Sequence, residues 1–558
     1  MVFLYKNMPL FYRNTFFRLV LFACVLFTSC DTNNFKEKAD HIYYNGTVYT
    51  VDNEFNIAEA FAVKDEEILA IGTTENILKK YSSDSKIDLK QKYIYPGFID
   101  AHSHFFWFAE GLNNLDLSNT NSLEEVLEVL NTANKNTPKD VIIGYGWDNT
   151  KWTNKNLPTK SILDKYFKNT PVILSRIDGH AMWVNSKVLE LAQITDSTKV
   201  QGGEIVKMNG NPTGVLVDNA MDFVNKLELG KVHPNQLPLL LSQAQDSCFK
   251  VGLTGVSDFG YIKRPTLILY DSLYRKGVLK IHNYAMLDAS LDGIDYMLSE
   301  NYIENEEFPR AIKLRGDGAL GSHGACLLSP YKDKKETYGQ MVLSSDKIRE
   351  ISKIAFDKEF QVCVHAIGDS TNREVLKIFS ELLEHNNDRR WRIEHAQVVN
   401  PKDIFFFKNY SIIPSVQPMH ATSDMDFAIE RLGDVRIQHS YTFQTLLNQN
   451  NWLPLGTDFP VEPINPLYTF YAAVARKDRS GLPEKGFQLK EALTREQALR
   501  GMTSWAAKAQ FMEDRIGSIE EGKEADFIIL DKDIMKIEID EVLKVEVINT
   551  YIKGNKVY

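Results

Sequence analysis

Two histidines separated by one residue, His102 and His104, end an apolar run that is typical of a buried strand. Side chains two positions apart on a strand point to the same side, so both imidazoles can face one cation. Partly exposed loop histidines show the same spacing without any metal. The pair alone therefore indicates a metal site only if other ligands lie close to it.

Three further residues of ligand type, His365, His395 and Asp458, end later apolar runs. Lys313 lies inside another such run, where an unpaired ammonium would be costly to bury. A lysine that snorkels outward or pairs with a carboxylate is the alternative there. Taken singly, each of these residues has a structural explanation, but their repeated place at strand ends favours a shared site. Imidazole and carboxylate groups together suit Zn, Fe, Ni or Mn.

The residues around these ligands alternate short apolar runs with amphipathic helical stretches, which predicts a parallel α/β fold. Continuous apolar runs are typical of parallel strands that are buried on both faces. Eight such runs occur, at 93–100, 254–258, 280–286, 311–314, 360–365, 391–395, 411–416 and 452–458. Eight strands close a TIM-like (β/α)8 barrel, whose active site lies at the C-terminal ends of the strands. The candidate ligands stand at those ends.

The predicted barrel spans residues 93–506 and contains an insertion at about 105–250. A structureless loop of that length is rare inside a barrel, so we expect an inserted subdomain. Apolar β signals at 141–147 support a small sheet there. Trp147 and Trp183 are better explained by packing in the core of this insertion than as walls of a pocket.

Both ends of the chain show the same sequence pattern, in which short β-rich runs alternate with turn residues. Residues 39–92 and residues 507–558 each hold too few strands to bury a core separately. We therefore expect both ends to pair into one small β-sandwich.

The N-terminus has the features of an export signal. An apolar run at 19–27 follows basic residues and is shorter than the ~20 residues that span a bilayer. The small residues before Cys30 resemble a bacterial lipobox, which implies a signal peptide at 1–29, lipidation of Cys30 and a tether at 30–38. An uncleaved anchor or a chance cysteine is the alternative. We expect an exported protein that a lipid anchors to a bacterial cell-envelope membrane.

Composition excludes several classes of protein. The 558 residues are 44% hydrophobic and 25% charged, as in ordinary globular proteins, and the net charge of −10 argues against a nucleic-acid partner. Cys248, Cys326 and Cys363 are scattered and form neither a disulfide framework nor a CxxC metal motif. Phosphate-binding glycine loops and nucleophile elbows are absent from the sequence.

The segment Pro96–His104 resembles the PGxxDxHxH signature of the amidohydrolase superfamily. Further segments resemble the YtcJ-like branch of amidohydrolase family 3, which includes N-substituted formamide deformylases: 312–325, 365–369, 392–397, 417–420 and 455–461. The resemblance covers roughly residues 40–558. One departure is His323, because many relatives carry arginine there in a GSRGA segment, and this weakens substrate inferences drawn from relatives.

The resemblance implies a site for two divalent metal ions, and family precedent favours zinc. His102, His104 and Asp458 would hold the more buried ion. His365 and His395 would hold the second.

The resemblance also implies that Lys313 bridges both ions after carboxylation, because a carbamate can ligate a cation and an ammonium cannot. A bridging water or a single-metal site is the alternative. A metal pair lowers the pKa of a shared water from ~15.7 toward ~7. Asp458 would take the proton of this water and pass it to the leaving amine, a contribution of ~10²–10⁴-fold. Glu394 and Gln397 flank His395 and are interpreted either as groups that orient it or as exposed polar residues.

Five residues near the strand ends are candidate substrate contacts: His180, Asp317, His323, Gln417 and His420. His180 belongs to the insertion, in a segment similar to one that reaches the site in the family. A purely structural histidine is the equal alternative for His180.

We expect the chain to hydrolyse a non-peptide C–N bond of a small molecule, such as an N-acyl or N-formyl amine. Opening of a cyclic amide, deamination and ester hydrolysis can run on the same site, so the fold does not decide among them. A catalytically inactive, lipid-anchored binding protein is the alternative from another class, and the complete ligand set argues against it. The sequence leaves a homodimer open as the assembly.

Overall fold

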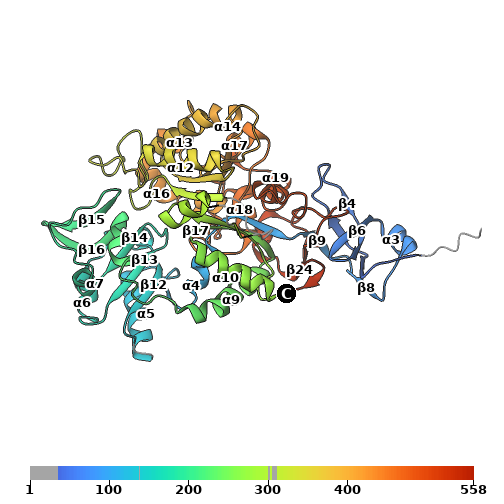
Figure 1. Cartoon of the computed structure of the whole chain (residues 1–558), viewed down its shortest axis with the longest axis horizontal. Helices are drawn as coiled ribbons and strands as arrows, with labels where there is room; N and C mark the ends of the chain where they lie inside the picture. Colours follow the sequence, from blue (N-terminus) through green and yellow to red (C-terminus); the bar gives the residue numbers. More distant parts are fainter. Residues whose placement is uncertain (1–35, 137–138, 300–301, 304–310) are drawn as a thin grey trace, which may run out of the picture.

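The computed structural model describes residues 36–136, 139–299, 302–303 and 311–558, so the predicted signal peptide and Cys30 lie outside the described residues. None of the helices in these ranges is long and apolar enough to cross a bilayer. Three parts follow one another along the longest axis of the molecule: an inserted sheet, a barrel, and the sheets of the chain ends (Figure 1).

The barrel sheet has seven parallel strands in the order β10-β17-β18-β19-β20-β21-β22. Their bounds are β10 Phe98–Ser103, β17 Leu253–Ile262, β18 His282–Asp288, β19 Ala311–Arg315, β20 Gln361–Ala366, β21 Arg392–His395 and β22 Ile413–Ser415. Residues around Leu455 close the gap between β22 and β10. The amide of Ala101 donates to the carbonyl of Leu455, and the amide of Gly456 donates to that of Val416. The predicted TIM-like barrel is confirmed, with this segment in place of a regular eighth strand.

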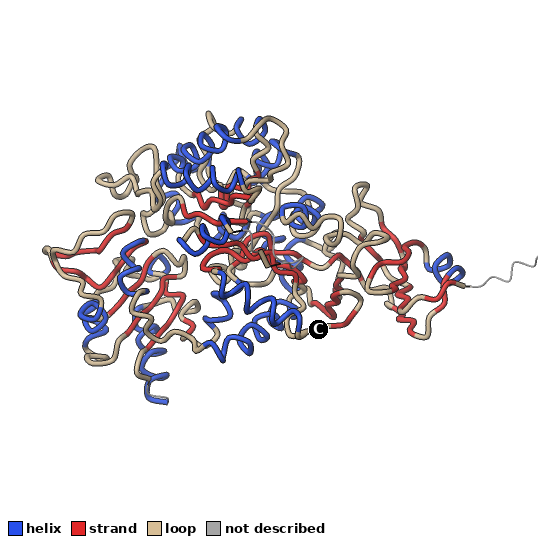
Figure 2. Tube along the Cα trace, in the orientation of Figure 1, coloured by secondary structure: helices blue, strands red, loops and turns tan. Residues whose placement is uncertain are grey.

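Helices surround the barrel strands, as the blue coils around the central red strands show in Figure 2. Four of the barrel helices given below begin with an N-cap residue whose side chain accepts a backbone N–H: Ser290, Ser344, Asn465 and Thr494. The helices are α4 Phe105–Gly111, α9 Leu237–Lys250, α10 Arg264–Arg275, α11 Leu291–Leu298, α12 Ser345–Asp357, α13 Asp369–Leu382, α14 Phe405–Asn409, α15 Pro418–Ser423, α16 Met425–Arg436, α17 Phe443–Asn450, α18 Pro466–Ala475, α19 Arg495–Gly501 and α20 Ser504–Ala509.

The insertion forms a six-stranded sheet in the order β11-β12-β13-β14-β16-β15. Its elements are β11 Leu115–Asp116, α5 Leu123–Asn136, β12 Ile142–Trp147, α6 Lys160–Asp164, β13 Val172–Arg176, β14 Ala181–Val184, α7 Ser186–Leu191, β15 Gly203–Met208, β16 Asn211–Asp218 and α8 Asp222–Asn225. Trp147 and Trp183 are fully buried in one of its two cores, as their interpretation as packing residues implies. Helices α4 and α9 pack in the barrel core, so the separate sheet of the insertion begins only at β11.

The chain ends build two further sheets, in the orders β6-β5-β2-β8 and β25-β24-β23-β9-β3-β4. Their elements are β2 His41–Tyr44, β3 Thr47–Tyr49, β4 Ile57–Ala58, β5 Ala60–Lys64, β6 Glu67–Gly72, α3 Thr74–Lys80, β8 Ser85–Asp88, β9 Tyr93–Pro96, β23 Phe527–Leu530, β24 Val547–Ile552 and β25 Asn555–Lys556, with β1 Glu37–Lys38 and β7 Tyr81–Ser82 pairing separately. One buried core joins Tyr43 and Phe61 from the first end to Phe527 and Tyr551 from the last. Both ends thus share one core.

The first predicted barrel strand, 93–100, is divided between two sheets at Gly97. Its first half, β9, pairs with β23 of the end sheet, and its second half continues into β10 of the barrel. A Cβ atom on Gly97 would lie 2.2 Å from Thr254 Oγ1, so only glycine fits this crossing point. The apolar pattern runs through the break because both halves are buried.

Candidate metal centre

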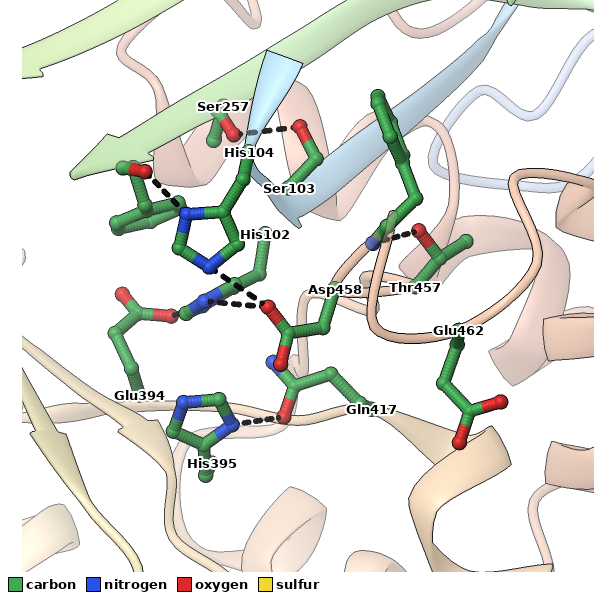
Figure 3. Close-up of polar contacts among 12 residues, drawn as sticks. His102, Ser103, His104, Ser257, Glu394, His395, Gln417, Thr457, Asp458 and Glu462 are labelled. Atoms are coloured by element: carbon green, nitrogen blue, oxygen red, sulfur yellow. Dashed lines mark hydrogen bonds and ion pairs between the residues drawn. The ribbon is translucent and has the colours of Figure 1, made fainter. Parts of the chain in front are cut away.

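His102 lies on β10 and His104 directly follows this strand, as the residue before α4. Both reach the carboxylate of Asp458, which follows the segment that closes the barrel (Figure 3). Asp458 Oδ1 is 3.3 Å from His102 Nε2 and 3.0 Å from His104 Nε2. His102 and Asp458 are buried, whereas the side chain of His104 is 19% exposed. The three side chains converge at the C-terminal end of the strands, where barrels of this type place their active sites.

Two buried atoms of this group, His102 Nε2 and Asp458 Oδ1, make no hydrogen bond to any part of the described chain. Such orphaned atoms are rare in folded proteins and call for an explanation. With bonds of about 2.0–2.1 Å, two ligands on one tetrahedral zinc ion lie about 3.4 Å apart. The separations of 3.3 Å and 3.0 Å come close to that value, so these residues fit a divalent cation.

Oxygen acceptors fix the orientation of the imidazoles through their Nδ1 atoms. Glu394 Oε2 lies 2.6 Å from Nδ1 of His102, and the backbone carbonyl of Phe259 contacts Nδ1 of His104. When Nδ1–H donates to such an acceptor, Nε2 keeps its lone pair and is free to ligate a metal. The same construction recurs at His395, whose Nδ1 is 2.8 Å from Gln417 Oε1.

His395 ends β21, and His365 is the last residue but one of the neighbouring β20. Their ring centroids are 4.5 Å apart. The ring of His395 is also 4.7 Å from that of His102. One ligand atom each from His102, His395 and Asp458 lies within 4.8 Å of the others. The backbone angle φ is +71° at His395 and +68° at Asp458, in the left-handed region that non-glycine residues adopt less often than glycine.

Lys313 lies on β19 with 7% of its surface exposed. Its Nζ is 4.3 Å from the ring centroid of Phe259, on which the ring of His102 also stacks at 4.1 Å. Burial lowers the pKa of Lys313 to about 8, although the charges of Glu394 and Asp458 oppose this shift. Among the described residues none forms an ion pair with its ammonium. A buried, unpaired amine beside the histidines is suited to carboxylation.

Glu394 and Arg392 form a buried ion pair below the imidazoles, with Arg392 Nε 2.7 Å from Glu394 Oε1. Burial opposes ionisation of this carboxyl, but the charges of Arg392 and His102 outweigh it and hold the pKa of Glu394 at about 2. Burial likewise opposes ionisation of Asp458, yet His102 and other neighbours keep its pKa well below the usual range. Both carboxylates are therefore ionised at neutral pH.

Asp100 fastens the first strand to the closing segment, a role that the sequence interpretation missed. Its carboxylate accepts hydrogen bonds from Thr457 Oγ1 at 2.6 Å and from the amides of His102 and Thr457, both at 3.0 Å. Burial raises the pKa of Asp100 to about 7. Asp100 is the aspartate of the PGxxDxHxH motif. Its position two residues before His102 was the feature of the sequence that could have pointed to this role.

The candidate substrate contacts divide between the centre and its surroundings. His180 reaches the centre from the insertion, with its ring centroid 5.0 Å from that of His365. Asp317 is fully buried and accepts the amides of Ile367, Gly368 and Cys326, so it supports loops beside the centre.

His323 has φ of +61° and directs its Nε2 to Asp333 Oδ2 at 2.9 Å. Arg431 binds the same carboxylate. This places His323 in a polar cluster with Asp333 and Arg431.

Gln417 and His420 each contact a candidate metal ligand. Gln417 orients His395, and its Nε2 has no partner among the described residues. His420 lies between two carboxylates, with Nε2 3.1 Å from Asp458 Oδ2 and Nδ1 3.2 Å from Glu462 Oε1.

Glu394 and Gln397 were predicted to orient His395 or to be exposed polar residues, and their contacts are different. Glu394 orients His102 instead of the adjacent His395, whose Nδ1 is held by Gln417. Gln397 donates to Asp424 Oδ2 at 3.0 Å and lies away from the ring of His395.

Comparison with known proteins agrees with this geometry. The sequence profile described as the amidohydrolase family matches residues 86–558. The chain belongs to the amidohydrolase family. Among relatives of this amidohydrolase, protein LONG AFTER FAR-RED 3 of Arabidopsis thaliana is 31% identical, with 93% of this chain and 92% of that protein covered. The amidohydrolase YtcJ of Bacillus subtilis is 32% identical, with 93% and 99% covered.

The N-substituted formamide deformylase of Arthrobacter pascens is 26% identical to this amidohydrolase, with 92% of this chain and 97% of the relative covered. A metal-dependent hydrolase from Pyrococcus horikoshii has a solved structure that superimposes with a TM-score of 0.72 at 28% identity. That alignment covers 89% of this chain and 99% of the other. The predicted resemblance to the YtcJ-like and formamide deformylase-like branch is therefore confirmed.

Proposed function

We propose that this amidohydrolase uses a metal centre to hydrolyse a non-peptide, amide-type C–N bond of a small molecule. The observation that carries the proposal is the convergence of His102, His104 and Asp458, whose facing atoms His102 Nε2 and Asp458 Oδ1 are buried without a hydrogen bond. A site that only bound an organic ligand has no need of such a cluster of cation ligands.

In this proposal His102, His104 and Asp458 hold the first ion, and His365 and His395 hold the second. Zinc suits the imidazole and carboxylate donors. When bound, such ions supply a Lewis acid and make water acidic enough to be deprotonated near neutral pH.

In this proposal the amine of Lys313 would add to carbon dioxide and lose a proton, and the resulting carbamate would be a further ligand of the ions. An amine forms a carbamate only as the neutral base, and Lys313 is buried beside Phe259 without a carboxylate partner, an environment that disfavours the ammonium. Glu394 and Gln417 orient the imidazoles of His102 and His395, respectively, through their Nδ1 atoms.

Asp458 is the proposed proton carrier. It is ionised at neutral pH and faces the imidazoles, so it can accept the proton of the attacking water and deliver it to the leaving nitrogen. His420 donates to its second oxygen and fixes the direction of the carboxylate. This proton transfer contributes about 10²–10⁴-fold to the rate.

The substrate class is supported by the relative named as an N-substituted formamide deformylase, which shares 26% identity over nearly the whole chain. The test is a screen of the purified, zinc-loaded protein against N-formyl amines, N-acyl amines, carboxylic esters and dipeptides. We expect turnover of an N-formyl or N-acyl amine that disappears with a chelator. Turnover of dipeptides or esters alone would contradict the proposed bond type.

We also propose that the chain is exported and held at a membrane by a lipid on Cys30. The lipobox-like residues before Cys30 support this. Replacement Cys30→Ser should move the protein from the membrane fraction to the soluble fraction of bacteria that express the full chain. Membrane association that persists in this variant would contradict the lipid anchor.

A further inference from the structure

The ring of His180 is held by its Nδ1 atom, as is the ring of His102 at the centre, although His180 belongs to the insertion. Its Nδ1 lies 2.7 Å from Asp218 Oδ1, in the same way that His102 Nδ1 meets Glu394. Both partners are buried: the side chain of His180 is 11% exposed and that of Asp218 is 1% exposed. Because Asp218 engages Nδ1, the Nε2 of His180 is left for another ligand.

Two other histidines among the candidate substrate contacts engage their rings differently. His323 directs Nε2 to Asp333, and His420 has a carboxylate on each nitrogen. Neither therefore has Nε2 free of protein partners. A histidine that ligates a metal usually donates its other ring N–H to a carboxylate or carbonyl, so the pairing with Asp218 is the arrangement expected of a ligand.

The ring of His180 lies at a spacing that suits a common ion. Two imidazoles on one zinc ion have ring centroids on the order of 4.5–5.2 Å apart for angles of 90–109° and bonds of about 2.0–2.1 Å. The centroid of His180 is 5.0 Å from that of His365, and His365 is 4.5 Å from His395. The ring-centroid distances from His180 to His365 and from His365 to His395 thus match those of imidazoles that share one zinc ion.

Backbone contacts place the insertion against the second ligand. The amide of Asp218 donates to the carbonyl of His180 at 3.0 Å, so ring and backbone are held together. A Cβ atom on Gly318 would lie 2.5 Å from Asp218 Oδ2, and the carbonyl of Gly318 is 3.5 Å from His365 Nε2. Gly318 therefore brings the insertion and the barrel into contact beside His365.

We propose that His180, oriented by Asp218, is a ligand of the second metal ion, with Asp218 as its positioning residue. The inference rests on the proposed metal centre and extends it: the second ion is held by the barrel histidines His365 and His395 together with a histidine of the insertion. The insertion then completes the centre. Asp218 Oδ2, which is buried without a hydrogen bond among the described residues, adds negative charge that favours a nearby cation.

The test measures zinc binding by the full-length protein, so it does not depend on a substrate. Metal is removed with dipicolinate, and zinc is titrated back in competition with a chromogenic chelator, with bound equivalents counted by elemental analysis. We expect two equivalents in the unaltered protein. In His180→Ala the affinity for one equivalent should fall at least about 100-fold, and in Asp218→Asn about 10-fold, the range found when a partner of a ligand is lost.

His323→Gln is the matched control, because His323 uses Nε2 for Asp333, and both of its zinc affinities should stay unchanged. Circular dichroism checks that each variant folds. If His180→Ala does not fold, Asp218→Asn still tests the inference. Two unchanged affinities in His180→Ala or in a folded Asp218→Asn would overturn this inference alone. Failure of the unaltered protein to bind zinc would overturn the proposed metal centre as well.

Discussion

The two ends of the barrel each hold a histidine with acidic neighbours at metal-ligand spacing. At the C-terminal end the group is His102, His395 and Asp458. At the opposite end His282, the first residue of β18, meets Glu524 and Asp526 of the C-terminal segment. Residue types and distances alone therefore do not separate a metal centre from an ion-paired joint.

The two groups differ in how their charges are already compensated. At the joint, His282 Nε2 is 2.7 Å from Asp526 Oδ2, and Arg515 Nη2 is 2.6 Å from Glu524 Oε1. Lys553 Nζ adds a cation 3.7 Å from Glu524 Oε2. The joint thus supplies its own positive charges and ties the barrel to the end sheets.

At the metal centre no lysine or arginine of the described residues pairs with Asp458, whose partners are histidines. His102 Nε2 and Asp458 Oδ1 face each other without a hydrogen bond, and the Arg392 guanidinium pairs with Glu394 instead. A buried acceptor without a hydrogen bond occurs in both groups, as Glu524 Oε2 and Asp458 Oδ1, so it does not tell them apart. The difference is that Glu524 has lysine and arginine partners, whereas Asp458 has neither among the described residues.

The largest effect is expected for Asp458→Asn. This change removes a proposed ligand and the proposed proton carrier at once, so kcat/KM should fall at least about 10³-fold. Steady-state kinetics on a substrate found in the screen checks it. Asp526→Asn at the joint is the matched control and should keep kcat/KM close to that of the unaltered protein. Equal losses in the two variants would erase the proposed difference between the two ends.

A smaller effect is expected for Glu394→Gln. The amide no longer provides the negative charge behind His102, so zinc affinity should fall about 10–100-fold. Chelator competition measures the affinity. Arg392 also loses its partner in the barrel, so thermal unfolding is followed in parallel. Unchanged zinc affinity would show that the orientation of His102 does not depend on this carboxylate.

The smallest effect on metal is expected for His282→Gln, which should leave zinc content unchanged. Loss of the contact with buried Asp526 should lower the free energy of unfolding by about 1–3 kcal/mol. Urea unfolding of the metal-loaded protein measures the stability, and elemental analysis measures zinc. A loss of bound zinc in this variant would mean that the joint is itself a metal site.

Much of the barrel could be predicted from the sequence, because buried parallel strands read as apolar runs and the candidate ligands stand at their ends. The division of 93–100 at Gly97 could not be predicted. Both halves are buried, and their partners, Leu253 and the strand at 527–530, are distant in sequence.

The proposed histidine and aspartate ligands of the barrel could likewise be identified because they stand at or just beyond the ends of apolar runs, and Lys313 because it is a charged residue inside such a run. Their supports could not. Glu394 lies beside His395 in the sequence but supports His102 across the barrel. Asp218 meets His180 only after the insertion has folded. Such pairings depend on tertiary packing, which no local pattern records.

The most direct test of the central claim is a crystal structure of the zinc-loaded protein with anomalous data collected at the zinc edge. The proposal predicts strong anomalous peaks among His102, His104, His365, His395 and Asp458, and none at His282. An absence of peaks at the C-terminal end of the barrel, or a single peak between His282 and Asp526, would contradict it.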